Sequence, residues 1–183
     1  MSKIRVVDYD PTWPETFEDL KASVAAALGD AVVAIEHVGS TSVPGLAAKP
    51  IIDMSIVVDS ADNVPGAIEM LATLGYRHLG DLAIGGREAF ENPAGLPDHN
   101  LYVCPQGGEG LRNHLAMRDH LREHPEVAAE YGRLKKRLAA EFPNDIDAYV
   151  DGKTEFILSV LAQRGLNEDE LARIEAANRL PPT

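Results

Sequence analysis

Apolar positions in the first half of the chain switch between helical spacing and short continuous runs. Phe17, Leu20, Val24 and Leu28 recur at intervals of three or four, which is the period of one helix face. Runs rich in Val and Ile, bounded by turn residues, instead indicate strands. These patterns predict, in order, a helix at 11–28, a strand at 31–38, a strand at 51–58 and a helix at 62–74.

The second half of the chain changes from turn-rich pieces to helical spacing. Residues 76–104 carry short strand-like pieces between Gly and Pro turns, and the last piece, from His99 to Cys104, is a predicted strand. The helices expected after residue 110 are 111–122, 125–142, 145–164 and 168–177. Strands followed by helices favour an α/β or α+β fold, a mixed sheet flanked by helices with a helical C-terminal part from about residue 110. The length predicts one domain, 1–183.

The balance of charge narrows the class of partner. The chain has 17 Lys and Arg against 29 Asp and Glu, a formal net charge of −12. Such an acidic surface repels nucleic-acid backbones and anionic membranes unless a local basic pocket overrides it, so neither partner is expected. A single cysteine, no signal-like apolar segment behind the first residues and no run of about 20 apolar residues predict a cytoplasmic protein.

One acid lies within the most apolar run of the chain. Alternation along 51–58 puts Asp53 and Ser55 on one face of the strand and Ile52 and Met54 on the other. An ionised carboxylate in a buried strand costs several kcal/mol unless it is paired, hydrogen-bonded or bound to a metal. Asp53 is therefore either the partner of an Arg or Lys from the helices, or a metal or phosphate-side carboxylate that faces a cleft.

Several cations share helix faces with apolar residues. Lys153 falls within the apolar stripe of the helix at 145–164, and His114 and Arg118 lie on the apolar side of the helix at 111–122. Their long stems can snorkel, they can pair with carboxylates, or they can line a pocket for a phosphorylated ligand. Lys135 belongs to a basic cluster on the helix at 125–142, most of which is expected to face solvent.

The loop of residues 39–42, Gly-Ser-Thr-Ser, follows the first predicted strand. It is either a bend capped by hydroxyls or a phosphate cradle that offers backbone N–H groups, with Gly39 allowing close approach. Its place some 13 residues before Asp53 strengthens the second interpretation.

The whole segment 37–53, His-Val-Gly-Ser-Thr-Ser-Val-Pro-Gly-Leu-Ala-Ala-Lys-Pro-Ile-Ile-Asp, resembles the signature of the GrpB family, also called UPF0157. The resemblance extends over most of the chain. It includes residues 99–103 and 117–122, and Tyr149 with Lys153 before Phe156. The family is similar in fold to the nucleotidyltransferase superfamily, and a related domain occurs fused to dephospho-coenzyme A kinase. The resemblance implies that Gly39 and Ser40 begin a nucleotide-phosphate loop and that Asp53 holds the first metal-carboxylate position.

The sequence departs from the superfamily pattern at the other acids. The second carboxylate position is Ser55, and the third, on a neighbouring strand, falls near His99. Mg²⁺ needs clustered hard oxygen ligands, which Ser55 and His99 supply poorly. Either Mg²⁺ or Mn²⁺ uses a different set, such as Asp53 with Asp98 or His99, or catalysis has been lost and binding retained.

The leading hypothesis is a nucleotidyltransferase-like protein that binds a nucleotide or other phosphorylated small molecule, with nucleotidyl transfer if it is active. The alternative is a non-catalytic interaction or regulatory module in which the same charges form a buried ionic network. A metal hydrolase around His37 and His99 ranks third. The candidate residues are Asp53, His99 and Lys153 for catalysis, Asp53 and His99 for metal, and Gly39, Ser40, Thr41, Ser42, Lys49, Arg118 and Lys135 for phosphate or nucleotide binding.

Overall fold

A computed structural model describes residues 3–82 and 84–179. The strands are β1 (Ala34–Val38), β2 (Ile52–Val58), β3 (Arg77–Gly80), β4 (Glu88–Glu91) and β5 (His99–Pro105). The helices are α1 (Trp13–Leu28), α2 (Val64–Thr73), α3 (Glu109–Glu123), α4 (Pro125–Glu141), α5 (Ile146–Gln163) and α6 (Glu168–Asn178). Short 3₁₀ turns lie at Gly29–Ala31, Ser40–Ser42 and Ala61–Asn63.

The strands form one sheet in the order β1-β2-β5-β4-β3. β2 and β5 are parallel neighbours, whereas the other pairs are antiparallel. In this register Asp53 of β2 lies beside Asn100 of β5 and opposite Val38 of β1. The polar end of β2 is thus next to the turn that follows β1.

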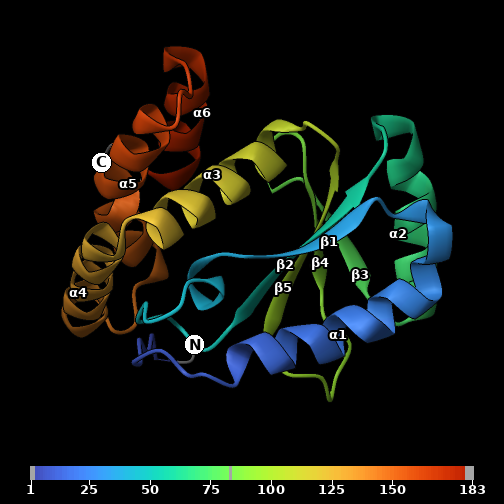
Figure 1. Cartoon of the computed structure of the whole chain (residues 1–183), viewed down its shortest axis with the longest axis horizontal. Helices are drawn as coiled ribbons and strands as arrows, with labels where there is room; N and C mark the ends of the chain where they lie inside the picture. Colours follow the sequence, from blue (N-terminus) through green and yellow to red (C-terminus); the bar gives the residue numbers. More distant parts are fainter. Residues whose placement is uncertain (1–2, 83, 180–183) are drawn as a thin grey trace.

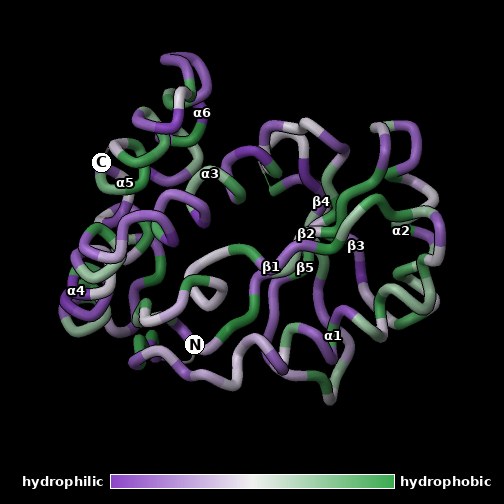
Figure 2. The backbone as a smooth tube through the Cα atoms, viewed as in Figure 1, coloured by the Kyte–Doolittle hydropathy of each residue, from purple (hydrophilic) through white to green (hydrophobic). Residues whose placement is uncertain are grey.

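Helices cover both faces of the sheet (Figure 1). α1 and α2 bury their apolar stripes against one face, where Phe17 and Leu71 share a core with Met54 and Ile56. On the opposite face Leu111 of α3 packs in a smaller cluster with residues of β2 and β5. Figure 2 shows hydrophobic residues concentrated in the central strands, whereas they alternate with hydrophilic ones along the helices. Burial of these apolar side chains is the main favourable term for the fold.

The helices α4, α5 and α6 gather beyond one end of the sheet (Figure 1). α5 packs against α3, α4 and α6. The loop between β1 and β2 reaches toward them, because Val43 and Leu46 are buried with Leu121 of α3 and Tyr131 of α4. The end of β1, the end of β2 and the C-terminal helices therefore meet in one region of the molecule.

The predicted α+β arrangement is confirmed, a mixed sheet with helices on it and a helical second half. Each predicted helix and strand is present, and the first strand begins at Ala34 because Gly29–Ala31 form a 3₁₀ turn. None of the helices in the described part of the chain is long and apolar enough to cross a membrane. That residues 1–183 form a single domain stays a prediction.

Candidate functional site

The chain turns at Gly39, directly after β1. Gly39 has a φ of +68°, in the left-handed region that glycine adopts without strain. A Cβ atom at this position would stand 2.1 Å from Oδ2 of Asp53, which is too close for any side chain. The absence of a side chain at Gly39 thus brings the turn Ser40–Ser42 against the carboxylate at the start of β2.

Asp53 is held by its neighbour on β5. Nδ2 of Asn100 donates a hydrogen bond to Oδ1 of Asp53 over 2.7 Å. Burial raises the pKa of Asp53, while the Asn100 hydrogen bond and the charges of Lys49, Lys153 and Lys135 act in the opposite direction. The carboxylate is therefore partly buried but not isolated.

Three lysines from three separate segments surround this carboxylate. Lys49 precedes β2, Lys135 lies on α4 and Lys153 lies on α5. Lys135 is only 2% exposed, and its Nζ donates to Oγ of Ser40 over 2.6 Å. Since Asp53 is one charge against three, most of the positive charge has no counterpart here.

The lysines repel one another. Burial first, and then the charges of Lys153 and Lys49, hold the pKa of Lys135 well below its ordinary value. Burial, followed by the charge of Lys49, lowers the pKa of Lys153 to about 8. In both cases Asp53 acts against the shift. A cation in such surroundings gains from any additional negative charge.

Two tyrosines support the ammonium groups. Nζ of Lys135 lies 4.6 Å from the ring centre of Tyr131, and Nζ of Lys153 lies 4.7 Å from that of Tyr149. Nζ of Lys49 lies 5.9 Å from the centre of the same Tyr149 ring. Aromatic faces attract cations without neutralising them. The tyrosines therefore place the charges and leave them free to bind an anion.

These side chains enclose a cavity of about 190 Å³, which we call the lysine cavity. Its lining residues are Ser40, Thr41, Ala48, Lys49, Ile51, Asp53, Asn100, Tyr131, Lys135, Tyr149 and Lys153. Among these described residues Asp53 is the only acid. The lysine cavity is a local reversal of charge in a chain whose formal net charge is −12.

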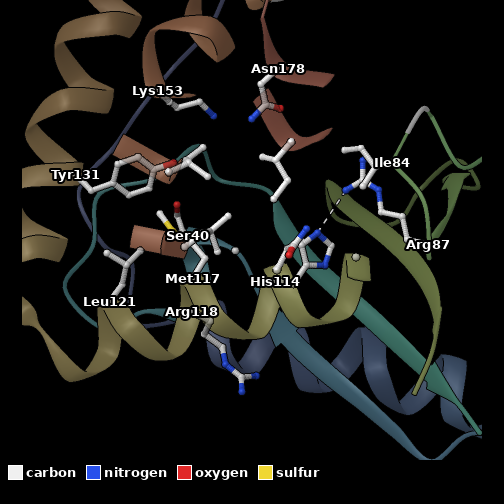
Figure 3. Close-up of a pocket in the computed structure, with 16 residues that line it drawn as sticks. Ser40, Ile84, Arg87, His114, Met117, Arg118, Leu121, Tyr131, Lys153 and Asn178 are labelled. Atoms are coloured by element: carbon white, nitrogen blue, oxygen red, sulfur yellow. Dashed lines mark hydrogen bonds between the residues drawn. The ribbon is translucent and has the colours of Figure 1, made fainter. Parts of the chain in front are cut away.

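A second cavity of about 300 Å³, the helix cavity, adjoins the first between α3, α5 and α6. The two share Ser40, Tyr131 and Lys153. In Figure 3, Lys153 and Tyr131 lie at one side of the helix cavity, whereas His114 and Arg87 lie at the other. Its remaining lining is largely apolar and includes Ile84, Met117, Leu121, Ile157, Leu161 and Ile174.

A family model described as GrpB protein matches residues 3–163. The chain belongs to the GrpB family. UPF0157 protein YqkA of Bacillus subtilis is 40% identical over 155 residues, and the glutamate-rich protein GrpB of Alkalihalophilus pseudofirmus is 34% identical over 164 residues. The matches cover 85% and 87% of this chain, 45% of YqkA and 94% of that GrpB protein. The chain thus spans less than half the length of YqkA.

Solved structures agree with this membership. The crystal structure of the conserved protein GrpB from Enterococcus faecalis matches with a TM-score of 0.78 and 33% identity, over 92% of this chain and 98% of that one. A chain of the GLD-2/RNP-8 complex matches with a TM-score of 0.54 at 14% identity, over 83% of this chain and 59% of that one. At such low identity the second match is evidence for the fold alone. The nucleotidyltransferase-like fold is confirmed.

The resemblance of residues 37–53 to the GrpB signature is thereby confirmed. This segment of the GrpB fold brings its first and last parts together, because Gly39 and Ser40 lie at the lysine cavity with Asp53. Lys49, which only the resemblance singled out, lies there as well.

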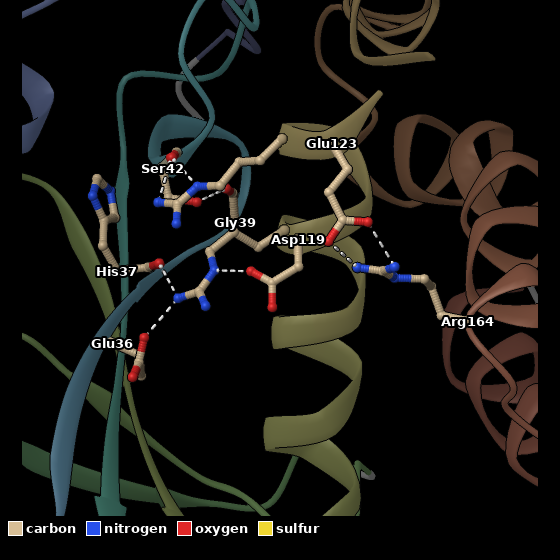
Figure 4. Close-up of polar contacts among 9 residues, drawn as sticks. Glu36, His37, Gly39, Ser42, Asp119, Glu123 and Arg164 are labelled. Atoms are coloured by element: carbon tan, nitrogen blue, oxygen red, sulfur yellow. Dashed lines mark hydrogen bonds and ion pairs between the residues drawn. The ribbon is translucent and has the colours of Figure 1, made fainter. Parts of the chain in front are cut away.

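Arg118 does not reach the lysine cavity of the GrpB fold, contrary to expectation. Its Nη1 donates to Oε2 of Glu36 over 2.6 Å and to the carbonyl oxygen of His37 over 3.2 Å, and its Nε donates to Oδ1 of Asp119 over 2.7 Å (Figure 4). In Figure 3 its guanidinium points away from the other labelled side chains. Arg118 lines the helix cavity, but its charge is paired with Glu36 and Asp119.

Thr41 and Ser42 stabilise the GrpB loop from within. Oγ of Ser42 donates to the carbonyl oxygen of Gly39 over 2.6 Å, and Oγ1 of Thr41 lies 3.0 Å from Nε2 of His37. Both side chains are buried. From α3, Nε and Nη2 of Arg122 donate to the carbonyl oxygen of Ser42 over 3.0 and 2.8 Å. Ser40 therefore carries the hydroxyl that faces the charges.

His99 lies on the other face of the sheet from Asp53, and this corrects the expected metal pair. Its Nε2 is 2.8 Å from the hydroxyl of Tyr76, and its Nδ1 is 2.7 Å from the carbonyl oxygen of Pro97. The parallel register pairs Asp53 with Asn100, so the expected third position is shifted by one residue and turned to the opposite side. His37 is likewise occupied, stacked on Phe17.

The residues of this GrpB chain do not fit the two-metal site of the superfamily pattern. Oγ of Ser55 is fully buried and lies 3.0 Å from Nδ1 of His114, so it is not open to a metal. The described residues contain no group of three or more His, Cys, Asp or Glu arranged to hold an ion. One carboxylate beside an amide and three ammonium groups lacks the clustered oxygen ligands that Mg²⁺ and Mn²⁺ prefer.

Sequence reasoning missed the roles of Asn100, Tyr131 and Tyr149. The sequence places Asn100 in a strand but does not show that it lies beside Asp53, because the pairing of β2 with β5 is set by long-range contacts. Tyr131 lies on α4, and its ring faces Lys135 four residues later. An aromatic residue four positions before a lysine on one helix is the signal that marks this pair.

Proposed function

We propose that this GrpB-family chain binds a nucleotide or another phosphorylated small molecule, with the phosphate groups in the lysine cavity. The supporting observation is the convergence of Lys49, Lys135 and Lys153 around the single acid Asp53. Like charges that are partly removed from water are unfavourable unless they are paired, and a phosphate chain supplies several negative charges at once. A cytoplasmic location belongs to the same proposal.

The uncharged part of the ligand would occupy the helix cavity. A molecule that touches Tyr131 and Lys153 with its phosphates meets the apolar residues Met117 and Leu121 next. The volume of about 300 Å³ is at the lower end of what ligand pockets show. A small planar group such as a base, with polar contacts to His114, fits this chemistry.

Calorimetric titration tests this proposal with ATP, CTP, GTP, UTP and inorganic triphosphate as probes. We expect binding of at least one of them, and a weakening of tenfold or more in Lys153→Met and in Lys135→Met. Lys136→Met is the matched control, because Lys136 is next to Lys135 on the same helix but pairs with Asp8 at the surface. Equal weakening by all three variants, or no binding by the unchanged protein, would count against the proposal.

A non-catalytic interaction module is the second candidate. Dephospho-CoA kinase of Mycolicibacterium paratuberculosis is 27% identical to this chain over 172 residues, and the match covers 80% of this chain but 42% of that protein. A GrpB-like segment thus occurs beside other sequence in a longer protein. Ser55 at an acid position also favours loss of transfer chemistry. If this candidate is right, the lysine variants change stability while no phosphorylated probe binds.

A further inference from the structure

We infer that the lysine cavity binds phosphate groups without a divalent cation, the ammonium groups of Lys49, Lys135 and Lys153 supplying the positive charge. This inference rests on the proposed function and adds how the ligand is held. Three observations support it: the few metal ligands near Asp53, the charges of the lysine cavity, and the arrangement of the lysines around the turn at Gly39.

The groups around Asp53 offer few oxygen ligands for a metal ion. Oδ1 of Asp53 accepts the hydrogen bond from Asn100, and Oδ2 lies against the backbone of Gly39. Asn100 therefore presents its NH₂ group, not an oxygen, toward the carboxylate. Two residues on, Ser55 is fully buried and hydrogen-bonded to His114. A hard cation next to Asp53 would find a single carboxylate. One of its oxygens already accepts a hydrogen bond from Asn100, and the other lies against Gly39.

The charges of the lysine cavity also disfavour a divalent cation. A divalent cation would enter a cavity that already contains three ammonium groups and one acid. Like charges at such short range repel strongly when they are screened from water. Besides burial, the charges of Lys153 and Lys49 lower the pKa of Lys135 and the charge of Lys49 lowers that of Lys153, and the cavity lining offers one acid against three lysines. A polyanion relieves this excess, whereas Mg²⁺ increases it.

The arrangement also suits a phosphate chain. The lysines come from the loop before β2, from α4 and from α5, so they approach the cavity from different sides. Lys135 is already fixed on the Ser40 hydroxyl, which positions one charge at the Gly39 turn. Asp53 keeps the lysines together before the ligand arrives, since its charge is felt by both Lys135 and Lys153.

The test is titration of the full chain with inorganic triphosphate and with ATP, once in excess EDTA and once in excess Mg²⁺. We expect binding in EDTA at least as tight as in Mg²⁺, because the metal neutralises the phosphates that the lysines attract. Asp53→Asn should still bind triphosphate in EDTA, since the ammonium groups and not a metal on this carboxylate hold the phosphates. Asp59→Asn, an exposed change at the other end of β2, controls for net charge.

Binding that requires Mg²⁺ and disappears in Asp53→Asn would overturn the inference and leave the proposed function standing. No binding in either buffer would overturn both. Electron paramagnetic resonance of Mn²⁺ gives a measurement that does not depend on a variant. We expect the spectrum of the free ion to persist when the ligand-free protein is added in excess, and its loss with the unchanged protein but not with Asp53→Asn would contradict the inference.

Discussion

Gly39 and Asp53 are in contact, and no side chain other than hydrogen fits between them: a Cβ on Gly39 would lie 2.1 Å from Oδ2 of Asp53. The antiparallel pairing of Val38 with Asp53 brings the two together at the ends of β1 and β2. The glycine and the acid of the GrpB signature are therefore one structural unit, although 13 residues separate them in the sequence.

Gly39→Ala should destabilise the fold through both backbone and contact. Gly39 and Gly45 each have a positive φ, but a Cβ on Gly45 meets nothing within 4 Å. We expect Gly45→Ala to cost about 1–2 kcal/mol in the free energy of unfolding, from the left-handed backbone alone. Gly39→Ala should cost a further ~1–3 kcal/mol from the collision with Asp53. Urea unfolding measures the free energy of unfolding of both variants. Equal decreases would show that the contact between Gly39 and Asp53 does not contribute to stability.

Local sequence patterns were sufficient to predict the helices and strands and the face of β2 on which Asp53 lies. The repeat of Phe17, Leu20 and Val24 and the alternation along β2 are both properties of neighbouring residues. They depend on the geometry of a single helix or strand, so a single sequence reveals them.

The partners of Asp53 could not be found in this way. His99 and Asn100 are adjacent, and only the pairing of β2 with β5 decides which of them faces Asp53. Arg118 shares a helix face with apolar residues, but its charge is taken by Glu36, which lies 82 positions away. Such choices depend on contacts between segments distant in the sequence, for which local periodicity carries no signal.

Lys135→Met should make the protein more stable while it weakens ligand binding. The side chain is buried among like charges, and an apolar side chain of similar length relieves the repulsion and the cost of burial. We expect a gain of about 1 kcal/mol or more in the free energy of unfolding. Lys136→Met, at the exposed neighbouring position, should stay within about 0.5 kcal/mol. A marked loss of stability in Lys135→Met would show that its bond to Ser40 outweighs the repulsion.

Tyr76→Phe should lower stability and leave the binding of triphosphate unchanged. The hydroxyl of Tyr76 is the partner of Nε2 of His99, and its removal leaves a buried ring nitrogen without a hydrogen bond. The expected cost is about 1–3 kcal/mol in the free energy of unfolding. Because His99 is on the opposite face of the sheet from Asp53, the dissociation constant should not move. A large change in affinity would restore His99 to the site.

Affinity for triphosphate should fall as the pH rises above about 8. Burial and Lys49 lower the pKa of Lys153 to about 8, so in the free protein its ammonium group loses its proton through this range. A bound phosphate favours the charged form and raises that pKa, which means that binding takes up a proton at alkaline pH and weakens as protons become scarce. Any further ionisation of the triphosphate in this range adds negative charge and strengthens its attraction to the lysines, so it does not cause the decline. Lys153→Arg keeps its charge at every pH of the experiment and should flatten the profile. Titration of both proteins between pH 7.5 and 9.5 measures the difference, and profiles of equal slope would assign the proton to another group.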